Sequence, residues 1–390
     1  MFLGPWFRQS GNWAIRMIDL SALLSAVKPK DRTDQYLILG AMYSLQAHVN
    51  PVTVREITDK LTLHLGTKIP KNIYARLREY TAYVSPVQGP PLRWSLTESG
   101  IEQLGINSGL NLPTKPDENS FDFDVGIVCA LEYPEFAAVV KALGGDAAWK
   151  EVGDPRDAHV YRETKLITEH GKTLRVVAVT TSTMGLTAAA IATTHLVLQY
   201  RPRLVAMIGI AAGTRSGGKQ FGDVLVADPS VDYNSGKVVF ENGIREFQPD
   251  PYPIGLNTRL RSVLHKYRSS AHPLFAEIRK RWSGPTPDAP NRLHVGPVGA
   301  ADQVIDDPTR ILEIQRNWRK LIGVEMETYG VYRAIYESPE PKPRAVSFKA
   351  VCDFAAEKSD SWQEYAAFMA AEFAVGVLKR EWATLWPSTP

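Results

Sequence analysis

The sequence predicts two folded parts, of which the larger is an α/β domain with a largely parallel sheet flanked by helices. Length is the first observation, because 390 residues exceed the size of one average domain. After about residue 120, buried strands and helical stretches alternate along the chain, as is typical of α/β folds. Before that point the pattern is mostly helical, and a segment rich in Gly, Asn and Pro separates the two parts.

This pattern divides the chain into an N-terminal extension (1–30), a compact helical module (31–105), a linker (106–121) and a catalytic α/β domain (122–390). The extension lacks a basic region followed by an apolar run, so we expect no secretion signal. No run of about 18 apolar residues exists, so we expect no membrane span.

The composition excludes several other classes of protein. Hydrophobic residues make up 44% and charged residues 22% of the chain, the range of an ordinary globular protein. The two cysteines, Cys129 and Cys352, lie far apart, which excludes a disulfide framework and a cysteine zinc site. This usage favours a reducing, cytoplasmic location. We predict no metal and no cofactor.

Three helices and a two-stranded ribbon are predicted in the helical module. Helical patterns cover residues 34–49, a stretch opened by Thr53 and Glu56 at capping-box spacing, and residues 70–80. A strand–turn–strand pattern follows at 83–96, and a last helix ends near Leu104. This order resembles a winged helix-turn-helix module, which contacts DNA through its third helix or docks on protein. Residues 1–118 hold 13 basic and 10 acidic side chains, and this small excess favours protein or ligand contact over DNA.

In the larger domain, apolar runs predict strands at residues 123–130, 173–180, 204–210, 221–228 and 345–351. Helices are predicted from Glu135, at residues 185–200 and at residues 361–382. The sequence Glu325-Met326-Glu327 joins an apolar run to a helix-compatible one. Buried carboxylates cost several kcal/mol unless they are partnered, and adjacent ribose hydroxyls are suitable partners. In the alternative, Glu325 caps the helix and Glu327 is solvated.

In their order along the chain, the motifs of residues 123–383 resemble the purine nucleoside phosphorylase and nucleosidase superfamily, with methylthioadenosine/S-adenosylhomocysteine nucleosidases as the nearest likeness. The matching segments are 125–135, Gly185, 208–213, 222–224, 296–302, 324–327 and 352–353. The resemblance implies a mixed sheet flanked by helices, with the winged-helix-like module as a smaller domain. It also implies a homo-oligomer whose neighbouring subunit completes the site.

The resemblance implies a role for each site residue. Asp353 protonates N7 of the departing purine, Glu327 binds the ribose 2′-hydroxyl, and Glu135 activates the attacking water. Substrate contacts are implied for Met326, Glu325, Gly209, Ile210, Ala211, Asp302, Gln303, Val304, Cys352 and Lys349, the last standing in the place of a basic residue near the acid.

The chain departs from the family pattern at several of these positions. One extra residue in the first motif leaves Glu132 as an alternative to Glu135. Cys352 replaces a serine, and Asp302 and Gln303 stand where an aromatic residue often stacks on the base. The contacts to the base are therefore less defined by the sequence than the contacts to the sugar.

Water is the expected nucleophile. Met207 and Ile210 occupy positions where phosphorylases carry an arginine and a serine, and apolar residues there would leave a phosphate unpaired. Arg215 and Lys219 either meet a phosphate on the 5′ side of the substrate or belong to a solvated loop.

The sequence thus predicts an N-glycosidase that releases a purine, with adenine favoured, from a nucleoside or nucleotide. Its N-terminal module would govern the activity, as in nucleosidase domains that resemble bacterial antiviral defence effectors. Phosphorolysis and a nucleotide-sensing DNA-binding regulator are the alternatives.

Overall fold

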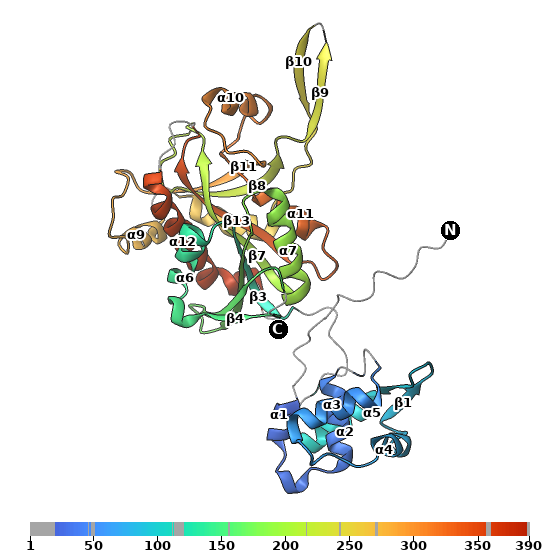
Figure 1. The fold of residues 1–390 in the computed structure, drawn as a ribbon. Helices are drawn as coiled ribbons and strands as arrows, with labels where there is room; N and C mark the ends of the chain where they lie inside the picture. The colour runs from blue at the N-terminus through green and yellow to red at the C-terminus, as the bar shows by residue number, and fades with distance from the viewer. Residues whose placement is uncertain are drawn as a thin grey trace. The chain divides into compact units, whose positions relative to one another are not determined.

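The computed structural model describes residues 20–387 except 46, 48–50, 111, 113–120, 155–156, 216, 242, 270–271 and 356–359. The chain divides into two compact units, Met1–Ser120 and Phe121–Pro390, each with its own hydrophobic core (Figure 1). Most of the predicted N-terminal extension and most of the predicted linker lie outside the described residues. The division into extension, module, linker and catalytic domain stays a prediction.

The first unit contains helices, a two-stranded antiparallel ribbon and a last helix. Its elements are α1 (Leu20–Ala26), η1 (Pro29–Asp31), α2 (Asp34–Ser44), α3 (Val54–Leu65), α4 (Ile73–Glu79), β1 (Val84–Val87), β2 (Arg93–Leu96) and α5 (Glu98–Ser108). The capping box of α3 is confirmed, because the Thr53 hydroxyl accepts from the Glu56 N–H and the Glu56 carboxylate accepts from the Thr53 N–H. The winged-helix assignment stays a prediction.

The last helix of this unit is longer than predicted. The predicted end near Leu104 is wrong, because α5 continues to Ser108, into the predicted linker. The Ser108 hydroxyl donates to the Leu104 carbonyl, and Gly109 takes the left-handed conformation, with φ 68°, that ends many helices.

Among the described residues, the second unit is built on a nine-stranded mixed sheet in the order β12-β11-β8-β13-β7-β3-β6-β5-β4. Its strands are β3 (Phe123–Cys129), β4 (Lys150–Val152), β5 (Tyr161–Ile167), β6 (Thr173–Thr180), β7 (Pro202–Gly213), β8 (Val224–Asp232), β11 (Leu293–Ala300), β12 (Gly323–Glu325) and β13 (Arg344–Asp353). Strand β12 also pairs with β7, so β7, β13, β8, β11 and β12 close into a ring.

Two blocks of the sheet are parallel, and one of them consists of β8, β11 and β12. β6, β3, β7 and β13 run parallel, whereas β4 and β5 at one edge and the pairs β13–β8 and β12–β7 are antiparallel. The sheet is therefore mixed, as the family resemblance implies, and five of its nine strand pairings among the described residues are parallel. The strand β5 buries Tyr161, Thr164 and Leu166 between more exposed residues, so it lacks the unbroken apolar run that marks the central strands.

Helices cover both faces of the sheet. The helices are α6 (Ala137–Ala142), α7 (Leu186–Tyr200), α8 (Thr258–His265), α9 (Pro273–Arg279), α10 (Pro308–Asn317), α11 (Thr328–Tyr336) and α12 (Gln363–Leu385). α7 packs beside α11 on one face, and α12 packs on the other face together with α6 (Figure 1). A hairpin of β9 (Gly236–Glu241) and β10 (Ile244–Pro249) projects from this unit. In the described part of the chain, no helix is long and apolar enough to cross a membrane.

A buried tyrosine holds α11 against the sheet. The Tyr332 hydroxyl donates to the Ala227 carbonyl of β8 at 3.2 Å and accepts from the Ser347 N–H of β13 at 3.1 Å. Tyr332 is 1% exposed, so water does not replace its hydroxyl as the partner of these two backbone groups. The hydroxyl therefore fixes the position of α11, whose N-terminus carries Glu327.

We predict that Tyr332→Phe lowers the free energy of unfolding by about 1–3 kcal/mol, because it leaves buried backbone groups without their partner. Tyr336→Phe on the same helix is the matched control, since Tyr336 is 61% exposed and should give no measurable change. Urea unfolding of both variants measures the difference. Equal stability of the two variants would contradict the assigned role of the hydroxyl.

Candidate active site

A cavity of about 310 Å³ opens where the carboxyl ends of β3, β7, β12 and β13 meet. Open α/β sheets commonly bind ligands at this edge. The residues that line it are Ala130, Leu131, Glu135, Met184, Ile210, Ala211, Ala212, Gln303, Val304, Ile305, Val324, Glu325, Met326, Glu327, Cys352, Asp353, Asp360 and Gln363. The three predicted catalytic residues, Glu135, Glu327 and Asp353, thus line one cavity.

Glu135 is held by backbone N–H groups from two strand ends. It lies in the π-helical turn η2 (Glu132–Phe136) and is 2% exposed. One carboxylate oxygen accepts from the N–H groups of Ala130 and Leu131 at 2.7 and 3.0 Å, and the other accepts from the Ile210 N–H at 2.8 Å. Burial raises the pKa of Glu135, the Lys349 ammonium opposes this rise, and the charge of Glu327 adds to it.

The alternative to Glu135 lies elsewhere. The Glu132 carboxylate pairs with the Arg162 guanidinium at 3.1 Å, and the side chain of Glu132 is 59% exposed. Glu132 does not line the cavity. The structure therefore places Glu135, and not Glu132, among the other site residues.

Glu325 and Glu327 follow each other at the junction of β12 and α11 but have different partners. The Glu325 carboxylate accepts from the N–H groups of Glu327 and Thr328 at 2.9–3.0 Å, so it caps the helix, as in the alternative interpretation of the sequence. Burial raises the pKa of Glu325, and the Lys349 ammonium opposes this rise. Glu327 is 4% exposed rather than solvated and accepts from the Gly185 N–H at 3.2 Å.

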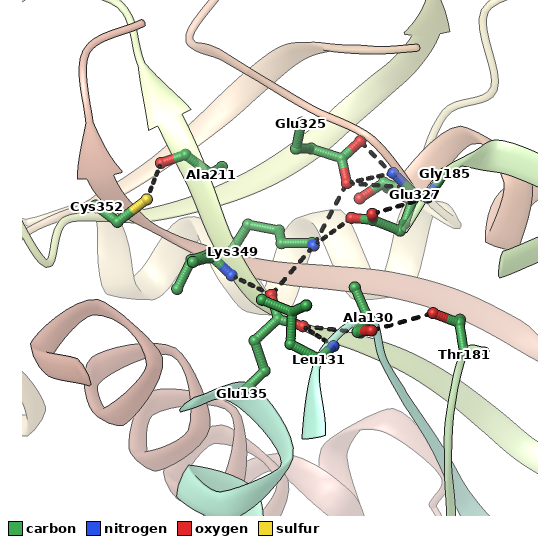
Figure 2. A network of polar contacts seen from close by, with 12 residues as sticks. Ala130, Leu131, Glu135, Thr181, Gly185, Ala211, Glu325, Glu327, Lys349 and Cys352 are labelled. Carbon is green, nitrogen blue, oxygen red and sulfur yellow. Dashed lines mark hydrogen bonds and ion pairs between the residues drawn. The ribbon is translucent and has the colours of Figure 1, made fainter. Parts of the chain in front are cut away.

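Lys349 brings these carboxylates together (Figure 2). Its ammonium donates to Glu327 at 2.9 Å and lies 3.6 Å from a carboxylate oxygen of Glu135 and of Glu325. Burial favours a lower pKa for Lys349, but the three carboxylates outweigh burial and hold the pKa above its usual value. Lys349 does not line the cavity and lies at the glutamates rather than at Asp353, so its predicted place near the acid and its predicted substrate contact are not what the structure shows.

Asp353 ends β13 on the cavity wall. One of its carboxylate oxygens accepts from the Ala355 N–H at 2.7 Å, and the Cys352 thiol lies 3.4 Å from the other. The same thiol lies 3.5 Å from the Ala211 carbonyl (Figure 2). Cys352 therefore contacts Asp353 and the Ala211 carbonyl, in the position where the family pattern has a serine.

Most of the predicted substrate-binding residues line the cavity, namely Glu325, Met326, Ile210, Ala211, Gln303, Val304 and Cys352. Besides Lys349, Gly209 and Asp302 do not. The Asp302 carboxylate accepts from the Leu186 N–H at 2.6 Å, so it binds the N-terminus of α7 instead. A Cβ on Gly209 would lie 2.0 Å from a carboxylate oxygen of Glu135, so Gly209 provides the space in which Glu135 sits.

Sequence reasoning missed Met184, Asp360 and Gln363, which also line the cavity. Met184 directly precedes Gly185, which belongs to the matching family segments, and this adjacency could have indicated that Met184 belongs to the site. Asp360 and Gln363 lie at the start of the predicted closing helix, and nothing in their pattern distinguishes them from other first-turn residues.

Arg215 and Lys219, in the loop after β7, lie outside the cavity. The Arg215 guanidinium lies 5.3 Å from the centroid of the Phe354 ring, and the Lys219 ammonium donates to the Thr214 hydroxyl at 3.0 Å. Neither residue lines the cavity.

The model of the phosphorylase superfamily matches residues 124–375. The chain belongs to this superfamily. The predicted superfamily is thereby confirmed.

Curated relatives of the chain include nucleosidases. The chain is 31% identical over 259 residues to the uncharacterized protein y4jS of Sinorhizobium fredii, with 66% of this chain and 61% of the relative covered. It is 26% identical over 231 residues to the ATP nucleosidase Cap17 of Escherichia coli, covering 56% of this chain and 44% of Cap17. The 5′-methylthioadenosine/S-adenosylhomocysteine nucleosidase of Bacillus subtilis is 24% identical, with 51% of this chain and 79% of the relative covered. The chain therefore spans less than two thirds of y4jS and of Cap17.

Solved structures share the fold of the second unit. The methylthioadenosine/S-adenosylhomocysteine nucleosidase of Neisseria meningitidis has a TM-score of 0.50 and 19% identity, covering 66% of this chain and 98% of that one. Futalosine hydrolase of Helicobacter pylori also has a TM-score of 0.50, with 18% identity and coverages of 66% and 97%. The relatives with a named activity are nucleosidases, which hydrolyse N-glycosidic bonds, and this agrees with the predicted enzyme class.

We predict that Gly209→Ala displaces the Glu135 carboxylate and lowers the free energy of unfolding by about 1–3 kcal/mol, because the new methyl group overlaps a buried, hydrogen-bonded oxygen. Gly296→Ala on β11 is the control, since its Cβ would lie 3.0 Å from the Ile322 side chain and 3.8 Å from the nearest backbone atom, the Lys320 carbonyl oxygen. Chemical denaturation of both variants tests this. A Gly209→Ala protein as stable as wild type would mean that Glu135 does not occupy this space.

Proposed function

We propose that this protein hydrolyses the N-glycosidic bond of a purine nucleoside or nucleotide, with adenine as the released base. One observation carries the proposal: Glu135, Glu327 and Asp353, which are distant in sequence, line a single cavity. A cavity of about 310 Å³ is at the lower end of the range, roughly 300–1,000 Å³, of small-molecule sites.

The reaction assigns one task to each carboxyl group. The C1′–N9 bond breaks with its electron pair going to the purine, and Asp353 donates a proton to N7 of the base. A water oxygen forms the new bond to C1′, and Glu135 accepts the proton that the water loses. Glu327 accepts from the ribose 2′-hydroxyl, and Met326 packs on the sugar. Negative charge near the sugar stabilises the oxocarbenium character that develops in the transition state.

The lining of the cavity favours water over phosphate as the nucleophile. Among the lining residues that the structure describes, there is no arginine, lysine or histidine, whereas five are acidic: Glu135, Glu325, Glu327, Asp353 and Asp360. A phosphate dianion needs charge-assisted donors, and acidic side chains repel it. The two positions where phosphorylases carry an arginine and a serine offer no side-chain donor to a phosphate, because they are Met207, which is fully buried, and Ile210, whose backbone N–H donates to Glu135.

The names of the relatives support adenine as the base and leave the 5′ group to experiment, because they include a nucleosidase for ATP and others for methylthioadenosine. The proposal includes control of the activity by the N-terminal unit, a role in antiviral defence, and assembly of the chain into a homo-oligomer. Light scattering of the purified full chain tests the assembly.

We expect purified protein to release free adenine from at least one of adenosine, methylthioadenosine, AMP and ATP. Liquid chromatography of the products measures the base. Added inorganic phosphate should not raise the rate, and in ¹⁸O-labelled water the label should appear on C1′ of the sugar. Base release that depends on phosphate would replace hydrolysis by phosphorolysis, and no base from any substrate would refute the proposal.

We expect Asp353→Asn to lower kcat roughly 10²–10⁴-fold, the usual contribution of a general acid, because the amide cannot protonate N7. Asp306→Asn is the matched control, since Asp306 is exposed near the Gln303–Val304 loop and does not line the cavity. Steady-state kinetics of both variants, with the substrate from which the wild-type protein releases adenine, measures the difference. Comparable rates for wild type and Asp353→Asn would exclude the acid role.

A further inference from the structure

The buried charges beneath the cavity do not balance. The ammonium of Lys349 lies within 3.6 Å of three carboxylates, those of Glu135, Glu325 and Glu327. The four side chains are at most 7% exposed, so water screens their charges poorly. Three ionised carboxylates and one ammonium sum to −2, and a buried net charge of this size needs strong compensation.

Backbone donors compensate the three carboxylates unequally. Glu135 accepts from three N–H groups, those of Ala130, Leu131 and Ile210. Glu325 accepts from two, at the N-terminus of α11. Glu327 accepts from one, that of Gly185, and has the shortest contact to Lys349, at 2.9 Å. Glu327 therefore depends on Lys349 more than the other two carboxylates do.

The position of Lys349 shows that it acts through the glutamates. Its side chain extends from β13 beneath the cavity, and the ammonium points at the carboxylates of Glu135 and Glu327 (Figure 2). Lys349 is 1% exposed and does not line the cavity, so a substrate in the cavity meets the glutamates and not the lysine.

We propose that Lys349 is a positioning residue, whose ammonium keeps Glu135 ionised and holds Glu135 and Glu327 at the separation that the sugar and the attacking water require. This inference rests on the proposed hydrolysis, because it assigns the base and the ribose-binding group as that reaction does. One cation thus contacts both the base and the ribose-binding group of the proposed reaction.

The other titratable groups near Lys349 do not replace it. The Cys129 thiol on β3 is fully buried, and burial raises its pKa well above the usual value, so it contributes no charge at neutral pH. Glu132 pairs with Arg162, and Asp353 and Asp360 on the cavity wall are themselves acidic. Within the described residues, Lys349 is the cation paired with Glu135 and Glu327.

The test compares the pH dependence of kcat/KM in wild type, Lys349→Met and Lys349→Arg. Lys349→Met removes the charge that lowers the pKa of Glu135, so the acidic limb of the profile should move up by roughly 1–3 pH units. The preference for ribose over 2′-deoxyribose substrates should fall at least tenfold, because Glu327 loses its shortest partner. Lys349→Arg keeps the charge and should leave the acidic limb within about 0.5 pH unit of wild type, even if its rate is lower.

Lys342→Met, at an exposed position before β13, controls for the loss of a lysine and should leave both properties unchanged. If Lys349→Met does not fold, Lys349→Met/Glu325→Gln removes one negative charge with the positive one and should still show the upward shift. An unchanged acidic limb in the folded Met variant, or an equal shift in the Arg variant, would overturn the proposal.

A second readout does not need turnover. Infrared spectra of the carboxyl C=O stretch, with Glu135→Gln identifying the band, follow the protonation of Glu135 directly and should show the same upward shift in Lys349→Met. If wild type released no base, the proposed reaction would fail, and this titration would still decide whether Lys349 sets the charge of Glu135.

Discussion

The double pairing of the short strand β12 is the constraint on which the site depends. β12 runs parallel to β11 and antiparallel to the end of β7, and this closes five strands into a ring. Gly323 permits the closure, because a Cβ there would lie 2.7 Å from the Ala212 carbonyl oxygen. Glu325 is the last residue of β12, and Glu327 follows it at the start of α11. The closure of the ring therefore brings two carboxylates to the ends of β7 and β13. Without it, these glutamates would lie at a sheet edge, away from Lys349.

The sequence predicted those elements whose local pattern matches their burial. The strands β3, β6, β7 and β13 are rich in buried apolar residues, and each was predicted from them. The hairpin β9–β10 was not predicted, since its exposed Val238 and Phe240 lack the buried side chains that would indicate a strand against the core. The antiparallel pairings β12–β7 and β13–β8 connect residues far apart in sequence, and a local pattern carries no information about them.

The candidate site shows the same limit. The motif around Glu325 and Glu327 and the strand-end Asp353 were identified as site residues before the structure placed them together. The functions of Gly209 and Lys349 differ from those expected, because both residues contact the glutamates rather than the cavity. A sequence motif marks which residues belong to a site, but the neighbour that each one contacts is set by tertiary packing. Buried polar groups with several partners are the positions where this difference matters most.

The helix α7 has a mechanical consequence for the side of the cavity that Glu327 lines. Its first N–H groups belong to Gly185 and Leu186, and they bind Glu327 at 3.2 Å and Asp302 at 2.6 Å. Hydrogen bonds of this kind usually have nitrogen–oxygen distances of roughly 2.7–3.2 Å, so the bond to Glu327 is at the long end of the range. A displacement of α7 along its axis by only a few tenths of an ångström therefore weakens the hydrogen bond from Gly185 to Glu327, whereas the shorter bond from Leu186 to Asp302 is kept. The position of the Glu327 carboxylate thus depends on how firmly the fifteen-residue helix α7 is packed along its whole length.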